Sequence, residues 1–154
     1  MSVLVNEGLN VEIIDVISNI STKLKTRTFL VGGYVRDLLL GRKSKDIDVL
    51  VIGDGISFAS EVKKKLGSKA NLQIFKNFGT AMIAYNDLEI EFVGSRKESY
   101  QKSSRNPVVS VGTFEDDISR RDFTINSIAI SLNEDNKGKI IDLFDGVHLS
   151  LIHI

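Results

Sequence analysis

The sequence predicts an α+β fold, in which a small mixed or antiparallel sheet is flanked by helices. Three observations support this prediction. Apolar residues recur with helical spacing before Thr28 and again over residues 56–66. Short apolar runs of strand length lie between and after these segments, and two of them are separated only by the turn Asn86-Asp87. At 154 residues, the chain is long enough for one domain with a hydrophobic core.

The first half of the chain predicts alternating helices and strands. The first helix carries an apolar stripe made of Val11, Ile14, Ile17, Ile20 and Leu24. The elements that follow are a strand over 28–31, a helix over 34–40 that can stop at Gly41, a strand over 47–52, a helix over 56–66 closed by Gly67, and a strand over 72–75.

A hairpin is predicted next, with strands over 81–85 and 88–93. Alternation places Glu89 and Glu91 on one face of its second strand and apolar residues on the other. These two glutamates can equally be the solvent face of an antiparallel hairpin. A carboxylate on this face can also belong to a site shared with a neighbouring strand.

The second half of the chain has weaker patterns. Residues 94–106 are polar and precede the only proline, Pro107, so they predict a long loop. Residues 115–121 predict a short helix, and residues 122–131 form an apolar segment whose type the pattern leaves open. A final strand is expected over 139–143, before the turn Asp145-Gly146. No internal repeat and no second domain is visible.

Composition limits the possible functions. Lysine plus arginine equals aspartate plus glutamate at 20 each, so net charge neither supports nor excludes an RNA partner. The chain has no cysteine, which excludes disulfides and thiolate metal sites, and its two histidines, His148 and His153, make a histidine base or zinc cluster improbable. The N-terminus is unlike a signal peptide, and no apolar run approaches the roughly 20 residues that span a bilayer. We expect a cytoplasmic protein.

Residues 29–51 concentrate the groups that can do chemistry. Gly32 and Gly33 follow a buried strand and precede a helix, so backbone N–H groups and a helix N-terminus can face an anion. Arg36 stands one turn into that helix. Asp46 and Asp48 occupy positions i and i+2 of a second strand, so both carboxylates point to one face and can share a Mg²⁺ ion.

Two strand-borne carboxylates beside a phosphate cradle predict nucleotidyl transfer. Mg²⁺ prefers one or two carboxylates together with phosphate oxygens of the substrate. Two such ions, about 4 Å apart, can activate an attacking hydroxyl and stabilise a leaving pyrophosphate. Glu91 would complete the acidic cluster from the neighbouring strand. Catalysis would then come from positioning and charge neutralisation, without a protein nucleophile.

Several motifs extend over the rest of the chain. They are Gly32-Gly33-Tyr-Val-Arg36-Asp37 with Asp46-Ile-Asp48, Phe78-Gly79-Thr80, Glu91-Phe-Val-Gly-Ser-Arg96-Lys-Glu-Ser-Tyr100, Glu115-Asp-Asp-Ile-Ser-Arg120-Arg121-Asp122-Phe-Thr-Ile-Asn126, and Ile141-Asp142-Leu-Phe-Asp145-Gly146. In this order they resemble the class II tRNA nucleotidyltransferase and bacterial poly(A) polymerase family of the polymerase-β-like superfamily. One departure is Leu143, where the family has proline. The resemblance covers roughly residues 28–146.

The resemblance implies a domain organisation and roles for particular residues. Residues 1–27 would be an N-terminal helix and lead-in, and residues 28–148 a nucleotidyltransferase head domain of polymerase-β-like fold, with the neck, body and tail domains missing. The implied site consists of Asp46 and Asp48 as catalytic Mg²⁺ ligands, Glu91 as a third carboxylate, and Gly32, Gly33, Arg36 and Arg121 as nucleotide-binding residues. Each part has a simpler interpretation, since Gly-Gly after a strand is often only a turn and Arg120-Arg121-Asp122 can be a solvated helix end.

The substrates implied by the resemblance are ATP and CTP, with the 3′ end of a tRNA as acceptor and no template. CCA addition is the first hypothesis. Poly(A) addition and separate A-adding or C-adding activity stay open, because the missing neck selects the base. A hypothesis of another class is a noncatalytic nucleotide- or RNA-binding fragment. The arginines and lysines of residues 95–105 can also track RNA phosphates.

The last six residues, Leu149–Ile154, depart from the family pattern. They equal the translation of CTG TCT CTT ATA CAC ATC, a transposon-end adapter used in preparing sequencing libraries. We therefore expect that the native sequence stops at about His148 and that residues 149–154 are a non-native tail. The alternative is an ordinary apolar C-terminal strand.

Overall fold

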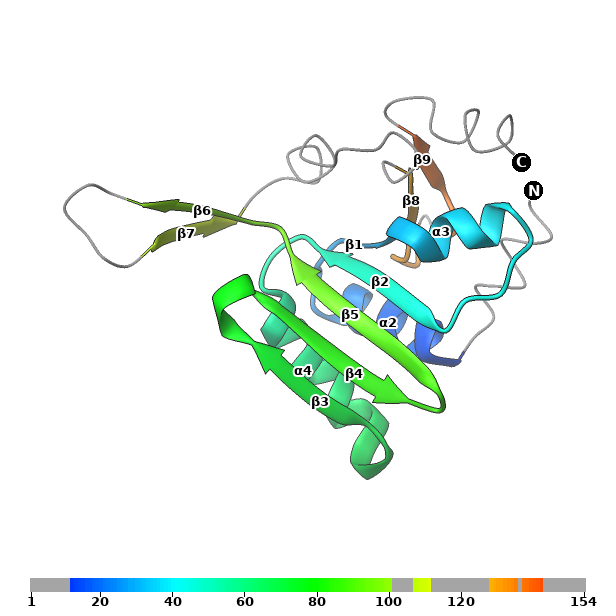
Figure 1. Cartoon of the computed structure of the whole chain (residues 1–154), viewed down its shortest axis with the longest axis horizontal. Helices are drawn as coiled ribbons and strands as arrows, with labels where there is room; N and C mark the ends of the chain where they lie inside the picture. Colours follow the sequence, from blue (N-terminus) through cyan, green and yellow to red (C-terminus); the bar gives the residue numbers. More distant parts are fainter. Residues whose placement is uncertain (1–11, 101–106, 112–127, 136, 143–154) are drawn as a thin grey trace.

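The computed structural model describes residues 12–100, 107–111, 128–135 and 137–142. Three α-helices lie within this part of the chain: α2 (Glu12–Lys23), α3 (Gly32–Leu39) and α4 (Gly55–Leu66). The main sheet has the strand order β3-β4-β5-β2-β1-β8-β9 (Figure 1). Its strands are β1 (Thr28–Val31), β2 (Asp46–Val51), β3 (Asn71–Phe75), β4 (Thr80–Tyr85), β5 (Leu88–Gly94), β8 (Ile128–Ser131) and β9 (Ile140–Asp142). The predicted α+β class is confirmed.

The sheet is mixed because β2 and β5 run parallel, whereas every other described pair within it is antiparallel. The predicted hairpin is confirmed, and it joins β4 to β5 through Asn86 and Asp87, both at positive φ. Positive φ at both central residues is what a two-residue type I′ turn requires. Helix boundaries differ slightly from the predictions, since α3 begins at Gly32 and α4 at Gly55.

The prediction of a long loop over 94–106 is wrong for residues 96–100, and residues 101–106 lie outside the described part of the chain. Residues Arg96–Tyr100 form β6, which pairs antiparallel with β7 (Pro107–Val111) in a separate two-stranded sheet. Figure 1 shows this hairpin extending away from the main sheet. The sequence of β6 shows no apolar alternation, so its pattern looked like a loop. The sequence pattern did not decide the type of structure over residues 122–131, and this segment ends in strand β8. The predicted helix over 115–121 and the turn at Asp145 lie outside the described residues.

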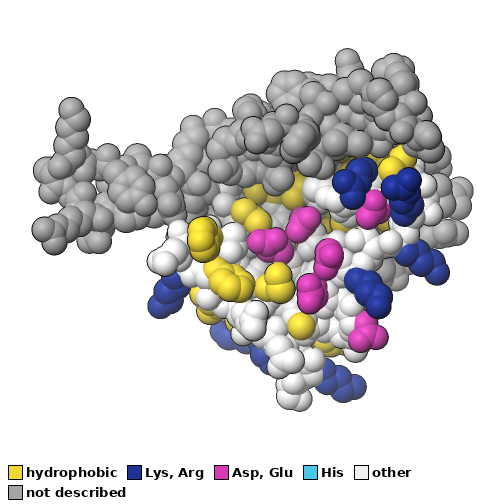
Figure 2. All heavy atoms as spheres, viewed as in Figure 1, with side chains coloured by type: hydrophobic (Ala, Val, Ile, Leu, Met, Phe, Trp, Pro, Cys, Tyr) yellow, Lys and Arg dark blue, Asp and Glu magenta, His cyan; other side chains and the backbone are white. Residues whose placement is uncertain are grey.

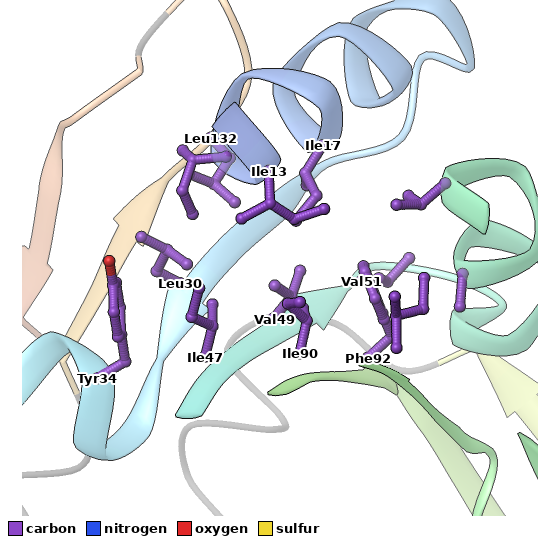
Figure 3. Packing of buried hydrophobic residues seen from close by; sticks show 14 of the residues in the cluster. Ile13, Ile17, Leu30, Tyr34, Ile47, Val49, Val51, Ile90, Phe92 and Leu132 are labelled. Atoms are coloured by element: carbon purple, nitrogen blue, oxygen red, sulfur yellow. The ribbon is translucent and has the colours of Figure 1, made fainter. Parts of the chain in front are cut away.

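The helices and the sheet enclose one main hydrophobic core. Figure 3 shows α2 facing the sheet residues that line this core. The fully or almost fully buried members include Ile13, Ile17, Leu30, Ile47, Val49, Val51, Ile90 and Phe92. Helix α4 adds Phe58, Ala59 and Val62 to the same cluster. Its N-terminus is capped by Asp54, whose carboxylate accepts hydrogen bonds from the backbone N–H groups of Ile56 and Ser57.

The opposite face of β2, β5, β4 and β3 is not covered by α2 or α4, and we call it the open face (Figure 1). Its composition follows from strand alternation, because the residues between the core positions point the other way. Paired positions across the strands form rows, and one row runs Asp48, Glu91, Met82, Gln73. Among the helices of the described residues, none is long and apolar enough to cross a membrane.

Asn133 ties the start of β1 to the segment that follows β8. Its Oδ1 accepts a hydrogen bond from the Thr28 N–H at 3.0 Å, and its Nδ2 donates to the Thr26 carbonyl at 2.9 Å. Asn133→Ala leaves both backbone groups without this partner, so we expect the free energy of unfolding to fall by about 1–3 kcal/mol in urea titration. Asn133→Asp keeps the acceptor and should lose less. Equal midpoints for the alanine variant and the parent would contradict this role.

Candidate active site

Asp46 and Asp48 lie on the open face, as predicted. Between them, Ile47 is buried in the core, whereas Asp46 is exposed and Asp48 is half-buried. The alternation of β2 therefore presents two carboxylates to one side of the sheet and most of its apolar residues to the core on the other. Leu50 shares the carboxylate side, where it is buried in a smaller cluster with apolar residues of β1 and β8. This alternation places both carboxylates where a substrate can reach them.

Gly32 brings the start of α3 directly against Asp48. The antiparallel register pairs Val31 with Asp48, so the chain that leaves β1 passes beside the aspartate. Gly32 has a φ of 71°, and a Cβ at this position would lie 2.8 Å from Asp48 Oδ2. Both the backbone conformation and the close approach require glycine. The first glycine of the predicted cradle is thus explained by a contact that the sequence did not reveal.

The N-terminus of α3 lacks the side-chain cap that α4 has. Val31 occupies the N-cap position and provides no side-chain hydrogen bond, and no acidic residue stands in the first turn of α3. The first backbone N–H groups of a helix have no partner within the helix, and the helix dipole favours an anion there. This helix start therefore has the features that favour phosphate binding, and phosphate binding by Gly32 and Gly33 stays a prediction.

Arg36 lies one turn further along α3. A Cβ on Gly33 would be 3.4 Å from Arg36 Nη2, so the guanidinium lies close to the second glycine. Arg36 Nε is 3.3 Å from Asp37 Oδ1, and the arginine side chain is partly exposed. A half-exposed ion pair of this kind contributes little stability, and it leaves the guanidinium able to bind phosphate oxygens.

The parallel pairing of β2 with β5 brings two glutamates beside the two aspartates. Asp46 pairs with Glu89 and Asp48 with Glu91, so four carboxylates form two rows. Figure 2 shows acidic side chains gathered on this face. Glu91 was predicted to lie on a strand next to that of the two aspartates, and the register of β2 and β5 confirms this position. Within the described residues, however, no three carboxylates converge as a ready-made group of metal ligands. Glu91 remains a proposal as a third ligand.

Tyr34, the third residue of the Gly-Gly-Tyr sequence, belongs to the core. Its side chain is buried, and Figure 3 shows it beside Leu30. Desolvation by burial raises the pKa of the Tyr34 phenol above its ordinary value, so it stays neutral at physiological pH. We assign it a packing role that holds α3 against the sheet. Arg121, predicted to contact the nucleotide, lies outside the described residues.

Known proteins share the sequence and fold of this chain. Residues 28–149 match a family model described as the poly A polymerase head domain. An A-adding tRNA nucleotidyltransferase from Aquifex aeolicus is 40% identical over 121 residues, which is 79% of this chain and 14% of that protein. The chain therefore spans a small part of this relative.

Two solved structures are also similar. The complex of a CCA-adding enzyme with ATP aligns with a TM-score of 0.79 at 30% identity, covering 97% of this chain and 34% of that one. A tRNA nucleotidyltransferase complexed with a primer tRNA and an incoming ATP analog aligns with a TM-score of 0.74 at 33% identity, covering 88% of this chain and 36% of that one. In both, the matching part is about a third of the protein.

Proposed function

Because the chain belongs to the family of poly A polymerase head domains, we propose that it carries the catalytic site of an enzyme that transfers nucleotides from CTP and ATP to the 3′ end of tRNA without a template. The observation that carries this proposal is the close approach of the Asp48 carboxylate to Gly32, the first residue of α3, with Asp46 on the same face. A carboxylate pair and a phosphate-binding helix start are needed together to hold a metal-bound triphosphate.

The donor set suits Mg²⁺. Asp46 and Asp48 offer hard carboxylate oxygens, and a Mg²⁺ site usually takes one or two such groups plus phosphate oxygens and water. We propose that these two residues hold the ion, with Glu91 as a third carboxylate. When bound, the metal would neutralise charge on the triphosphate and lower the pKa of the attacking hydroxyl.

The other residues of the site would bind and orient the nucleotide. The backbone N–H groups at Gly32 and Gly33 and the Arg36 guanidinium are the groups that can hold phosphate oxygens, and the resemblance adds Arg121. The acceptor 3′ oxygen would form a bond to the α-phosphorus while the bond to pyrophosphate breaks. Since no protein nucleophile is needed, positioning and charge stabilisation are the contributions of this chain.

The choice of base is a separate proposal. The A. aeolicus relative is named as A-adding and one structural neighbour as CCA-adding, so similarity to the head is compatible with either activity. CCA addition is our first proposal, and A-adding, C-adding or poly(A) activity is the alternative. Assays on the full-length protein with ATP alone, CTP alone and both decide between them. Incorporation of ATP alone would overturn CCA addition.

Asp46→Ala tests the metal site. We expect the variant to lose the Mg²⁺-dependent part of ATP affinity, measured by calorimetry with and without Mg²⁺, because one of the two carboxylate ligands is gone. Glu61→Ala is the control, since Glu61 is a carboxylate on α4 that pairs with Lys64. Unchanged Mg²⁺ dependence in Asp46→Ala would remove this residue from the site. Mg²⁺-dependent ATP binding without any incorporation by the full-length protein would favour a noncatalytic nucleotide-binding role.

A further inference from the structure

The turn between β3 and β4 exposes aromatic side chains beside a lysine. The 3₁₀ turn η2 (Lys76–Phe78) follows β3, and residues 74–78 line a hollow of about 400 Å³. Phe78 is 78% exposed, Ile74 43% and Phe75 42%. Within the described part of the chain, these are three of the four large hydrophobic residues that are exposed. We call residues 74–78 the aromatic corner.

The aromatic corner is continuous with the open face that carries the carboxylates. Phe75 pairs with Thr80, and Thr80 pairs with Val93. Val93 follows Glu91 on the same face of β5, so Phe75 belongs to the row next to that of Asp48 and Glu91. Strand spacing and rise place the Cα atoms of Asp48 and Phe75 about 16 Å apart. Figure 2 shows apolar side chains beside the acidic ones on this face.

The chemistry of the aromatic corner fits single-stranded RNA. Unpaired bases stack on exposed phenylalanine rings, and cationic side chains nearby bind the backbone phosphates. Lys76 supplies such a cation and Asn77 an amide for a base edge, both between the two phenylalanines. Lys76 places a positive charge at this corner, away from the four carboxylates of the open face, so a polyanion can approach here. A protein-binding surface would instead be depleted of lysine at its centre.

We propose that the aromatic corner is a stacking platform for the single-stranded 3′ segment of the acceptor RNA, a few nucleotides from the reacting hydroxyl. This inference rests on the proposed function, because it takes the acceptor to be RNA. Phe78 stacks on a base, Phe75 forms the side of the hollow, and Lys76 contacts a phosphate. The platform holds the RNA strand on the open face, so that its end can reach Asp46 and Asp48.

Tryptophan fluorescence tests the platform directly, because the chain contains no tryptophan. Phe78→Trp keeps an aromatic ring and introduces a single reporter. We expect its emission to be quenched when a short single-stranded RNA with a free 3′ hydroxyl is added. Leu24→Trp is the matched control, since Leu24 is 43% exposed and lies beside the groove between α2 and α4. No quenching of the Phe78→Trp variant at saturating RNA would overturn the proposal.

Two further variants measure affinity for the same RNA. Phe78→Ala should weaken RNA binding by about fivefold or more, because the variant lacks the ring on which a base stacks. Lys76→Gln should reduce the salt dependence of binding by about one unit of log–log slope. Lys65→Gln, on α4, should leave the slope unchanged. An unchanged affinity in Phe78→Ala would contradict the platform.

ATP titration of the same variants separates this inference from the proposed function. If Phe78→Ala binds ATP and Mg²⁺ normally but binds RNA weakly, both stand. If Mg²⁺-dependent ATP binding is absent from the parent chain while Phe78→Trp is still quenched by RNA, the catalytic proposal fails and the platform stands. If RNA affinity is unaffected but Phe78→Ala alters association with the other domains of the full-length protein, the aromatic corner is a domain interface and the platform is wrong.

Discussion

Gly32→Ala should reduce Mg²⁺-dependent ATP affinity by about tenfold to a hundredfold, the loss expected when hydrogen bonds to charged phosphate groups are lost. The reason is geometric: a methyl group at this position would lie 2.8 Å from Asp48 Oδ2, so the carboxylate or the start of α3 must move. Either movement separates the aspartate from the helix N-terminus. Calorimetric titration of ATP with and without Mg²⁺ measures the effect.

Gly67→Ala controls for backbone strain. Gly67 also has a positive φ, 81°, but a Cβ there would meet no atom within 4 Å. Backbone strain should lower the free energy of unfolding of both variants by about 1–3 kcal/mol, because alanine disfavours positive φ. Only Gly32→Ala should lose the metal-dependent part of ATP affinity. If the two variants bind ATP equally, the contact between Gly32 and Asp48 does not set the geometry of the site.

Phe92→Ala should lower the free energy of unfolding by about 3–5 kcal/mol, a large part of the stability of a domain this size. Phe92 is fully buried on the core face of β5, and its ring centroid lies 6.0 Å from that of Phe58. Removing the ring loses apolar burial and leaves a cavity between α4 and the sheet. Urea unfolding followed by circular dichroism gives the difference.

Phe78→Ala is the matched control for that experiment. It deletes the same ring at a position that is 78% exposed, so we expect a change within about 0.5 kcal/mol. A large loss of stability in Phe78→Ala would mean that the aromatic corner is part of the core. A small loss in Phe92→Ala would mean that the sheet and α4 close around the vacated space.

Local patterns predicted the elements well because each element of the core carries a strong local signal. The alternation in β2 predicted that Asp46 and Asp48 share a face, and the burial of Ile47 confirms it. The turn Asn86-Asp87 predicted the hairpin through its preference for positive φ. In contrast, β6 has no apolar alternation, so it was predicted as a loop although it pairs with β7.

The arrangement of the site depended on pairing that no local pattern contains. Asp48 lies opposite Glu91 because of the parallel register of β2 and β5. Gly32 lies close to the Asp48 carboxylate because the antiparallel register of β1 and β2 pairs Val31 with Asp48. Phe78 was noted only as part of a motif, and its exposure became visible in three dimensions. The role of Arg121 stays a prediction, because it lies outside the described residues.

The parallel pair β2–β5 also has a consequence for how the chain folds. Parallel neighbours cannot be joined by a tight turn, and here α4, β3 and β4 all lie between them in the sequence. Closing this crossover costs conformational entropy before the pairing of β2 with β5 contributes any stabilisation. This step should therefore be among the slow ones in folding. Asp48 and Glu91 become neighbours only when it is complete. The two rows of carboxylates therefore cannot form before β2 and β5 have paired. Recovery of Mg²⁺-dependent nucleotide binding after dilution from denaturant should accordingly lag behind recovery of helical signal.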